Sequence, residues 1–156
     1  MTTNGSEYDE RVLICAPMGR DAALIQQTLN RASITAEVCS DVGQVCREIV
    51  AGAAALSLTQ EALSPPGVEH LLDALGEQPS WSDLPIVVLV SRGPSMPTNS
   101  MLAAQLAPKA NVTFLERPVS VTTLVSATQA ALRTRHRQYE FRDLLSAHLQ
   151  AEEAER

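Results

Sequence analysis

The sequence predicts an α/β fold in which a five-stranded parallel sheet is covered by helices on both faces. Five short apolar segments alternate with amphipathic segments along the 156 residues, the order expected of repeated strand–helix units. The run from Ile86 to Val90 is continuously apolar and mostly β-branched, which is typical of a central parallel strand buried on both faces. Because crossovers between parallel strands are right-handed, these units should build a doubly wound sheet.

Each predicted strand is a short apolar or alternating segment bounded by residues that favour turns. Pro17 ends the first strand, and the second alternates between apolar and polar residues, as expected near a sheet edge. The third is rich in alanine, which has a low strand propensity. The five expected strands cover residues 11–15, 34–39, 53–58, 85–90 and 111–115.

Each predicted helix begins near a polar residue and carries apolar residues at a spacing close to 3.6. Asp21 lies in the first turn of the first helix, where a carboxylate interacts favourably with the helix dipole. Asp41 is a candidate N-cap for the second helix, which Gly52 ends. The last segment contains no glycine or proline over about 30 residues. The five expected helices cover residues 21–30, 42–51, 68–75, 99–107 and 121–151.

The composition restricts the class of protein. Hydrophobic residues make up 45% of the chain but aromatic residues only 3%, so the core must be aliphatic. A net charge of −6 argues against binding to nucleic acid or to an anionic membrane surface. We find no signal peptide and no apolar run of about 18 residues, so we expect no membrane span. Cys15, Cys39 and Cys46 lack metal-ligand spacing and indicate reduced thiols in a cytoplasmic protein.

The order of elements between residues 11 and 133 resembles the receiver domain of two-component signalling. The segment Trp81–Pro85 leads into the fourth strand as in many receivers, and Ser91 follows that strand where receivers carry the hydroxyl that contacts the phosphoryl group. Arg117-Pro118 stands where receivers carry Lys-Pro, often with a cis peptide. The segment 16–22 is similar to the opening of degenerate receiver-like domains that precede sensor histidine kinases. The resemblance implies the strand order 2-1-3-4-5.

The chain departs from this family at the residues that carry the chemistry. Ala16 and Pro17 replace the acidic pair, Thr59 replaces the phosphorylated aspartate, and Arg117 replaces the lysine. Mg²⁺ prefers carboxylate and water oxygens, and neither Ala16 nor Pro17 supplies a side-chain oxygen. We therefore expect no catalytic residue, no metal and no cofactor, and a degenerate phosphoacceptor site at Ala16, Pro17, Thr59, Ser91 and Arg117.

The last helix is longer than a receiver requires. We expect a disordered N-terminus at 1–10, a receiver-like domain at 11–133 and a helical, coiled-coil-like extension at 134–156 that projects roughly 30 Å. Its apolar residues recur near heptad spacing, although Arg135 and Arg142 interrupt the seam, and this spacing favours a parallel homodimer. The expected interface comprises Met101, Leu102, Leu106, Leu124, Leu132, Tyr139, Phe141, Leu145 and Leu149.

These observations favour a non-phosphorylated pseudo-receiver that acts by dimerisation and by contacts with a histidine kinase or other signalling domains. The resemblance implies an N-terminal regulatory module of a sensor histidine kinase. We expect no enzymatic activity from this chain itself. One alternative is a phosphorylatable receiver whose site is rebuilt from Asp21, Glu61 or Thr59. Another is a small α/β enzyme or nucleotide-binding protein with Cys15, Ser91 and Arg117 lining its cleft.

Overall fold

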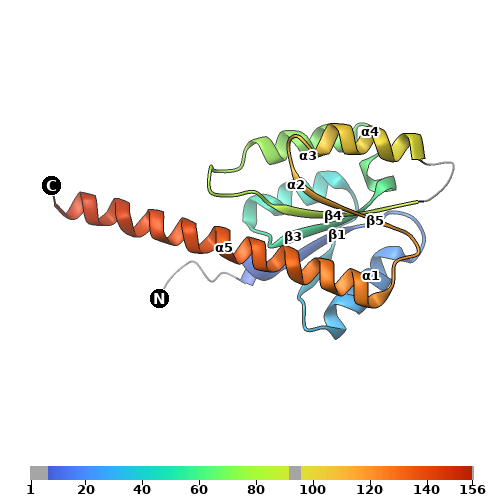
Figure 1. Cartoon of the computed structure of the whole chain (residues 1–156), viewed down its shortest axis with the longest axis horizontal. Helices are drawn as coiled ribbons and strands as arrows, with labels where there is room; N and C mark the ends of the chain where they lie inside the picture. Colours follow the sequence, from blue (N-terminus) through green and yellow to red (C-terminus); the bar gives the residue numbers. More distant parts are fainter. Residues whose placement is uncertain (1–6, 92–95, 156) are drawn as a thin grey trace.

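The computed structural model describes the backbone of residues 7–91 and 96–155, and the side chains of residues 7–91 and 101–155. Its centre is a five-stranded sheet with the order β2-β1-β3-β4-β5, in which all neighbouring strands are parallel. Helices α1 and α5 cover one face, and α2, α3 and α4 cover the other (Figure 1). The predicted doubly wound α/β fold and its strand order are therefore confirmed.

The elements begin and end close to the predicted positions. The strands are β1 (Val12–Cys15), β2 (Ala36–Val38), β3 (Ala55–Thr59), β4 (Pro85–Val90) and β5 (Asn111–Glu116). The helices are α1 (Asp21–Arg31), α2 (Val42–Ala51), α3 (Gly67–Gly76), α4 (Met96–Leu106) and α5 (Val121–Ala154). Two short 3₁₀ helices, η2 (Glu7–Glu10) and η3 (Gln60–Leu63), precede β1 and follow β3.

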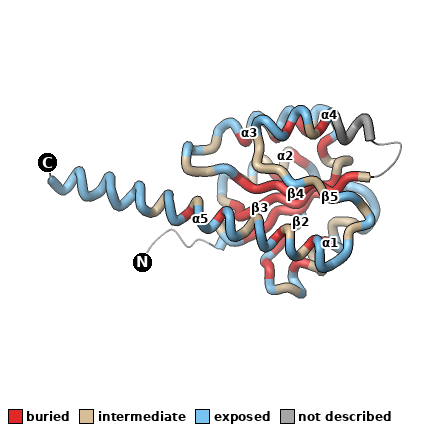
Figure 2. Tube along the Cα trace, in the orientation of Figure 1, coloured by how far each residue is buried: buried red, intermediate tan, exposed pale blue. Residues whose placement is uncertain are grey.

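The three central strands form the middle of the core. Every residue of β1, β3 and β4 is buried, because helices cover both faces of the sheet (Figure 2). The alanine-rich start of the third predicted segment is buried too, with Ala53 and Ala54 almost fully covered. Small side chains there allow close packing of neighbouring elements, which outweighs the low strand propensity of alanine.

A buried arginine directly precedes β1. Arg11 is only 1% exposed, and its guanidinium contacts the carboxylates of Glu37 and Glu48, each at 2.9 Å. Its Nε also donates to the carbonyl oxygen of Gly52 at 2.9 Å. These partners satisfy a charge whose burial would otherwise be costly.

Side-chain N-caps fix the starts of two helices, one at the predicted position and one that the sequence analysis did not predict. Asp41 Oδ1 accepts a hydrogen bond from the backbone N–H of Gln44 at 2.8 Å, which confirms the expected N-cap of α2. Ser120 Oγ accepts from the backbone N–H of Thr123 at 3.1 Å and caps α5 in the same way. Gly52 follows α2 with φ 135°, a conformation that favours glycine.

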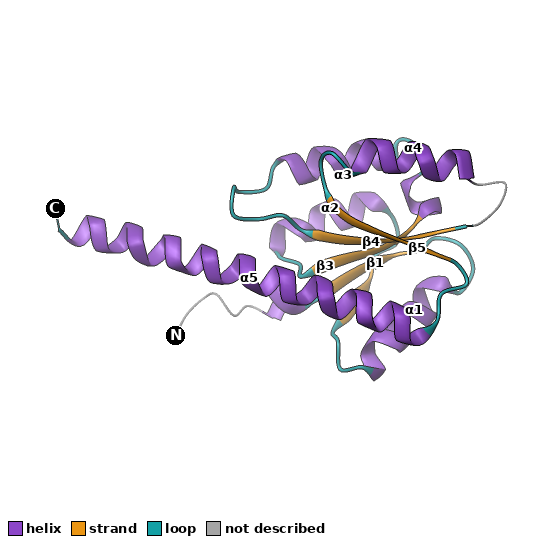
Figure 3. Cartoon of the chain, in the orientation of Figure 1, coloured by secondary structure: helices purple, strands orange, loops and turns teal. Residues whose placement is uncertain are grey.

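Helix α5 runs along the domain and then leaves it (Figure 3). Its buried residues include Leu124, Thr128, Arg135 and Tyr139, whereas every residue from 144 to 155 is exposed. The packed part of the helix therefore continues well past residue 133, where the sequence placed the start of the extension. Within the described part of the chain, no helix has the length and apolar character needed to cross a membrane.

Candidate functional site

The residues predicted to form the degenerate phosphoacceptor site lie at the carboxyl ends of the strands. Ala16 and Pro17 follow β1, Thr59 is the last residue of β3, Ser91 follows β4 and Arg117 follows β5. Since all five strands are parallel, these ends meet at one edge of the sheet, where open α/β sheets place their ligands.

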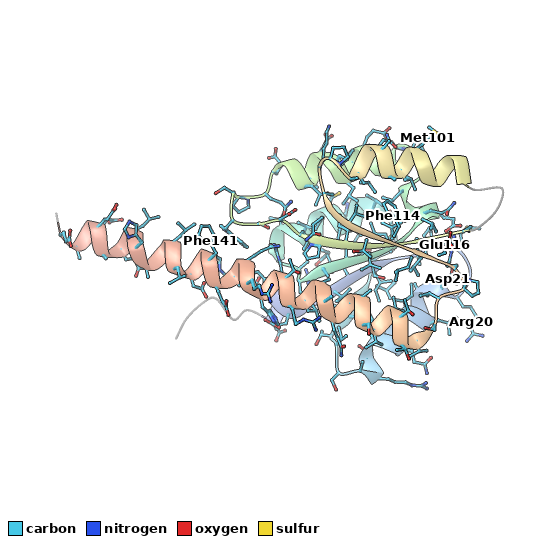
Figure 4. The ribbon with its side chains drawn as sticks, viewed as in Figure 1. Arg20, Asp21, Met101, Phe114, Glu116 and Phe141 are labelled. Carbon is cyan, nitrogen blue, oxygen red and sulfur yellow. The ribbon has the colours of Figure 1, made fainter. Side chains whose placement is uncertain are left out.

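The Arg117 side chain contacts three other side chains at this edge of the sheet. Its Nη2 donates to Glu61 Oε2 at 2.9 Å and to Ser91 Oγ at 2.7 Å. Its Nη1 lies 3.5 Å from Asp21 Oδ2. The guanidinium thus links the ends of β4 and β5 to η3 and to the first turn of α1. Figure 4 shows Asp21 beside this end of the sheet.

Glu61 is held in its ionised form by this arginine. Burial by itself would raise the pKa of the Glu61 carboxyl, but the hydrogen bond and the charge of Arg117 outweigh burial and lower the pKa below its ordinary value. The Glu61 carboxylate is therefore already paired with a cation of the same chain, the Arg117 guanidinium. A magnesium ion would have to compete with that cation for the same oxygens.

The Thr59 hydroxyl lies inside the protein. Thr59 is 1% exposed, and neither its Oγ1 nor Glu61 Oε1 makes a hydrogen bond of ordinary geometry, although Thr59 is close enough to contribute to the lowered pKa of Glu61. The neighbouring Gln60 turns toward β4, and its Oε1 accepts from the backbone N–H of Ser91 at 2.6 Å. No sequence signal indicated this bond, because it joins η3 to the residue that follows β4, 31 positions further along the chain.

Ala16 and Pro17 add no polar side-chain atom to this edge. Among the residues that the structure describes, no three His, Cys, Asp or Glu side chains gather closely enough to hold a metal ion. Cys15 is fully buried, and burial together with the nearby Cys39 and Asp41 raises the pKa of its thiol to about 11. A thiol of this kind is a poor nucleophile at neutral pH.

A groove of about 500 Å³ lies beside Arg117, between α1 and α5. Its walls are mainly apolar and include Leu24, Ile25 and Leu124. The Arg117-Pro118 peptide at its end is cis, a conformation that the sequence left open.

Helix α5 is attached to its own domain near the amino ends of the strands. The residues that attach it are ones that the sequence analysis placed in a dimer seam. Arg135 is 6% exposed, and its Nε donates to the carbonyl oxygen of Ala53 at 3.2 Å. Its Nη1 donates to Ser82 Oγ and to Gln138 Oε1, both at 2.7 Å. The sequence interpretation treated Arg135 as an interruption in a dimer seam, but the structure uses it to fasten the helix to its own domain.

Two further side chains complete this attachment. Tyr139 Oη lies 3.0 Å from the carbonyl oxygen of Ala53 and 2.8 Å from that of Asp9, and these two acceptors share its single O–H donor. The Arg142 guanidinium pairs with Asp9 Oδ2 at 3.2 Å and lies over the Trp81 and Tyr139 rings. A sequence signal did exist, because Arg135, Tyr139 and Arg142 are spaced by four and three residues and so share one helix face.

The structure divides the residues of the predicted dimer interface. Four of them are buried within the chain, so they are not available to a partner and their assignment is corrected: Leu102, Leu106, Leu124 and Tyr139. Leu132 is half-buried. Four others are exposed, with exposed fractions between 36% and 66%: Met101, Phe141, Leu145 and Leu149. Figure 4 shows Phe141 on α5 and Met101 on α4.

No family model and no curated protein matches this sequence. Solved structures do match it. A response regulator receiver protein from Sinorhizobium medicae is 18% identical with a TM-score of 0.65, and the match covers 83% of this chain and 99% of that one. The signal receiver domain of an HD domain-containing protein from Pseudomonas fluorescens is 16% identical with a TM-score of 0.68, covering 85% and 93%.

This chain has the receiver fold. NtrX from Brucella abortus, solved in complex with ADP, is 19% identical with a TM-score of 0.67 over 86% of this chain, which spans only 28% of that larger protein. Identities this low establish the arrangement of strands and helices only. What the receiver fold does in this chain must be argued from its own side chains.

Proposed function

We propose that this chain is a pseudo-receiver, a non-phosphorylated receiver-like domain that transmits signals through protein–protein contacts. The observation that carries this proposal is the engagement of Arg117 with Glu61, Asp21 and Ser91 at the edge of the sheet. An internal cation thus contacts the Asp21 and Glu61 carboxylates at this edge, while the ends of β1 and β3 provide no carboxylate.

The alternative of a rebuilt phosphoacceptor site is less favoured. Asp21 and Glu61, its two carboxylates, both contact the same guanidinium. Thr59, its possible hydroxyl acceptor, is buried, and the carboxylate beside it, that of Glu61, is paired with Arg117. The nucleotide-binding or enzymatic alternative placed Cys15 on the lining of its cleft with Ser91 and Arg117, and the complete burial of this thiol opposes that placement.

The output surface is proposed to be α5. Its last eleven or so residues leave the domain with every side chain exposed, and Phe141, Leu144 and Leu149 are each more than half exposed. A helix that shows several large apolar side chains is suited to bury them against a partner. We propose self-association through this helix, in a cytoplasmic two-component system in which the chain regulates a histidine kinase or another signalling domain.

The proposal is tested by amide NMR spectra of residues 1–156 during titration with Mg²⁺ and then beryllofluoride, which mimics a bound phosphoryl group. We expect no saturable shifts at Ala16, Thr59, Ser91 or Arg117. A triple variant, Ala16→Asp, Pro17→Asp and Thr59→Asp, restores the missing carboxylates and serves as the positive control. Saturable shifts in the unmodified chain would overturn the pseudo-receiver proposal in favour of a rebuilt site.

A further inference from the structure

Helix α5 has one face that packs on its own domain and another that is exposed. The face formed by Leu124, Thr128, Arg135 and Tyr139 is buried on the domain. Residues two positions further along, such as Arg137 and Phe141, lie on nearly the opposite side of the helix and are exposed. The projecting half of the helix therefore carries an apolar face that nothing in the described part of its own chain covers.

The exposed face has a polarised charge pattern. Arg137, Phe141, Leu145, His148 and Glu152 follow one another at intervals of three or four residues, so they lie along one stripe. All five are exposed, and the apolar residues occupy the middle of the stripe. Beyond them, arginines stand at the domain end (Arg133 and Arg137) and glutamates at the distal end (Glu152 and Glu155).

We infer that this face pairs with the same face of a second copy in antiparallel orientation, an inference that rests on the proposed self-association. An antiparallel pair centred between Leu144 and Leu145 sets Arg137 of each copy against Glu152 of the other, and Phe141 against His148. The apolar residues then meet at the two-fold axis, as an isologous interface requires. Opposite charges flank this centre on both sides, and such flanking pairs set the orientation of paired helices.

A parallel pair, which the sequence alone favoured, is opposed by the same charges. It would place Arg137 beside Arg137 and Glu152 beside Glu152, and like charges that face one another destabilise a contact. The domain does not obstruct the antiparallel arrangement from its packed face, because Arg135 and Tyr139 keep the domain on the other side of the helix. The two receiver folds would lie at opposite ends of the helix pair.

Sedimentation equilibrium of residues 1–156 provides the first test. Arg137→Glu should weaken self-association roughly tenfold, because two symmetry-related ion pairs become repulsive. Adding Glu152→Arg to that variant should restore the affinity to within about threefold of the native chain, since it restores opposite charges. In a parallel pair Arg137→Glu would only exchange one like-charge contact for another, so an unchanged affinity would overturn the inference.

Distances between spin labels provide the second test. Glu153 points away from the proposed contact, so a label on Glu153→Cys in a Cys46→Ser background should not disturb it. The antiparallel pair places the two labelled backbones about 26 Å apart along the axis, whereas a parallel pair places them about 10 Å apart. A short distance in a dimer would overturn the orientation but leave self-association standing. A monomer at high micromolar concentration would overturn both, and neither result bears on the NMR test of the phosphoacceptor site.

Discussion

Tyr139 Oη and Arg135 Nε donate hydrogen bonds to the same acceptor, the carbonyl oxygen of Ala53, at 3.0 and 3.2 Å. Ala53 lies two residues before β3, so this shared acceptor ties the middle of α5 to the start of a central strand. The two donors also contact each other, with 3.1 Å between Arg135 Nε and Tyr139 Oη. The orientation in which α5 leaves the domain is set at this point.

We expect Tyr139→Phe to destabilise the fold by about 1–2 kcal/mol, because the carbonyl groups of Ala53 and Asp9 lose the one hydroxyl donor that they share. Urea denaturation measures this loss. Hydrogen exchange should show a larger effect on α5 beyond residue 135 than on β4, because the attachment of the helix weakens first. Val50→Ala is the control, since Val50 is 88% exposed and should change stability by less than about 0.5 kcal/mol. Equal losses in both variants would show that the hydroxyl does not anchor the helix.

The ion pair of Glu61 with Arg117 should make stability depend on pH. The folded-state pKa of Glu61 lies below its ordinary value of 4.5, since the guanidinium outweighs the effect of burial. The ionised carboxylate therefore stabilises the fold above about pH 4.5, and this contribution is lost as the pH falls through the folded-state pKa. Glu61→Gln should be less stable than the native chain at pH 7.

The difference in unfolding free energy between Glu61→Gln and the native chain should shrink as the pH is lowered below 4.5, where the native carboxyl becomes protonated. Urea denaturation at a series of pH values measures it. Glu69→Gln, on the exposed face of α3, is the matched control and should show little difference at any pH. A Glu61→Gln difference that stays constant from pH 7 to pH 3 would contradict the assigned ion pair.

Gly52 should not tolerate a side chain. Its φ of 135° disfavours any other residue, and a Cβ there would lie 2.9 Å from Asp9 Oδ1 and 3.1 Å from Tyr8 Cβ. We expect Gly52→Ala to lower stability by more than about 1 kcal/mol. Gly76→Ala is the matched control, because a Cβ at Gly76 meets nothing within 4 Å. Thermal denaturation compares the two, and a neutral Gly52→Ala would mean that η2 does not pack against this turn.

Much of the fold could be predicted because its signals are local. The fourth strand was predicted at 85–90, where the structure has β4, since a continuous β-branched run needs no distant partner to be recognised. The N-cap at Asp41 was also predicted from neighbouring residues alone. The end of the packed part of α5 was not, because Arg135 and Tyr139 were judged by charge and heptad spacing without their partners.

In the candidate site, too, some features could be predicted from the residues themselves and others depend on contacts between distant segments. That Ala16, Pro17 and Thr59 cannot replace three carboxylates follows from the identity of these residues. That Arg117 contacts Glu61, Asp21 and Ser91 together depends on how four separate segments meet.

The sequence by itself determined the order of strands and helices and the loss of the acidic residues, because periodicity and side-chain chemistry are properties of neighbouring residues. Only the tertiary structure decided which apolar residues remain exposed and which cations are buried. The bonds of Arg135 and Tyr139 to Ala53 join residues 82 and 86 positions apart. Contacts of that range arise from the packing of a helix across the sheet, and no local pattern encodes them.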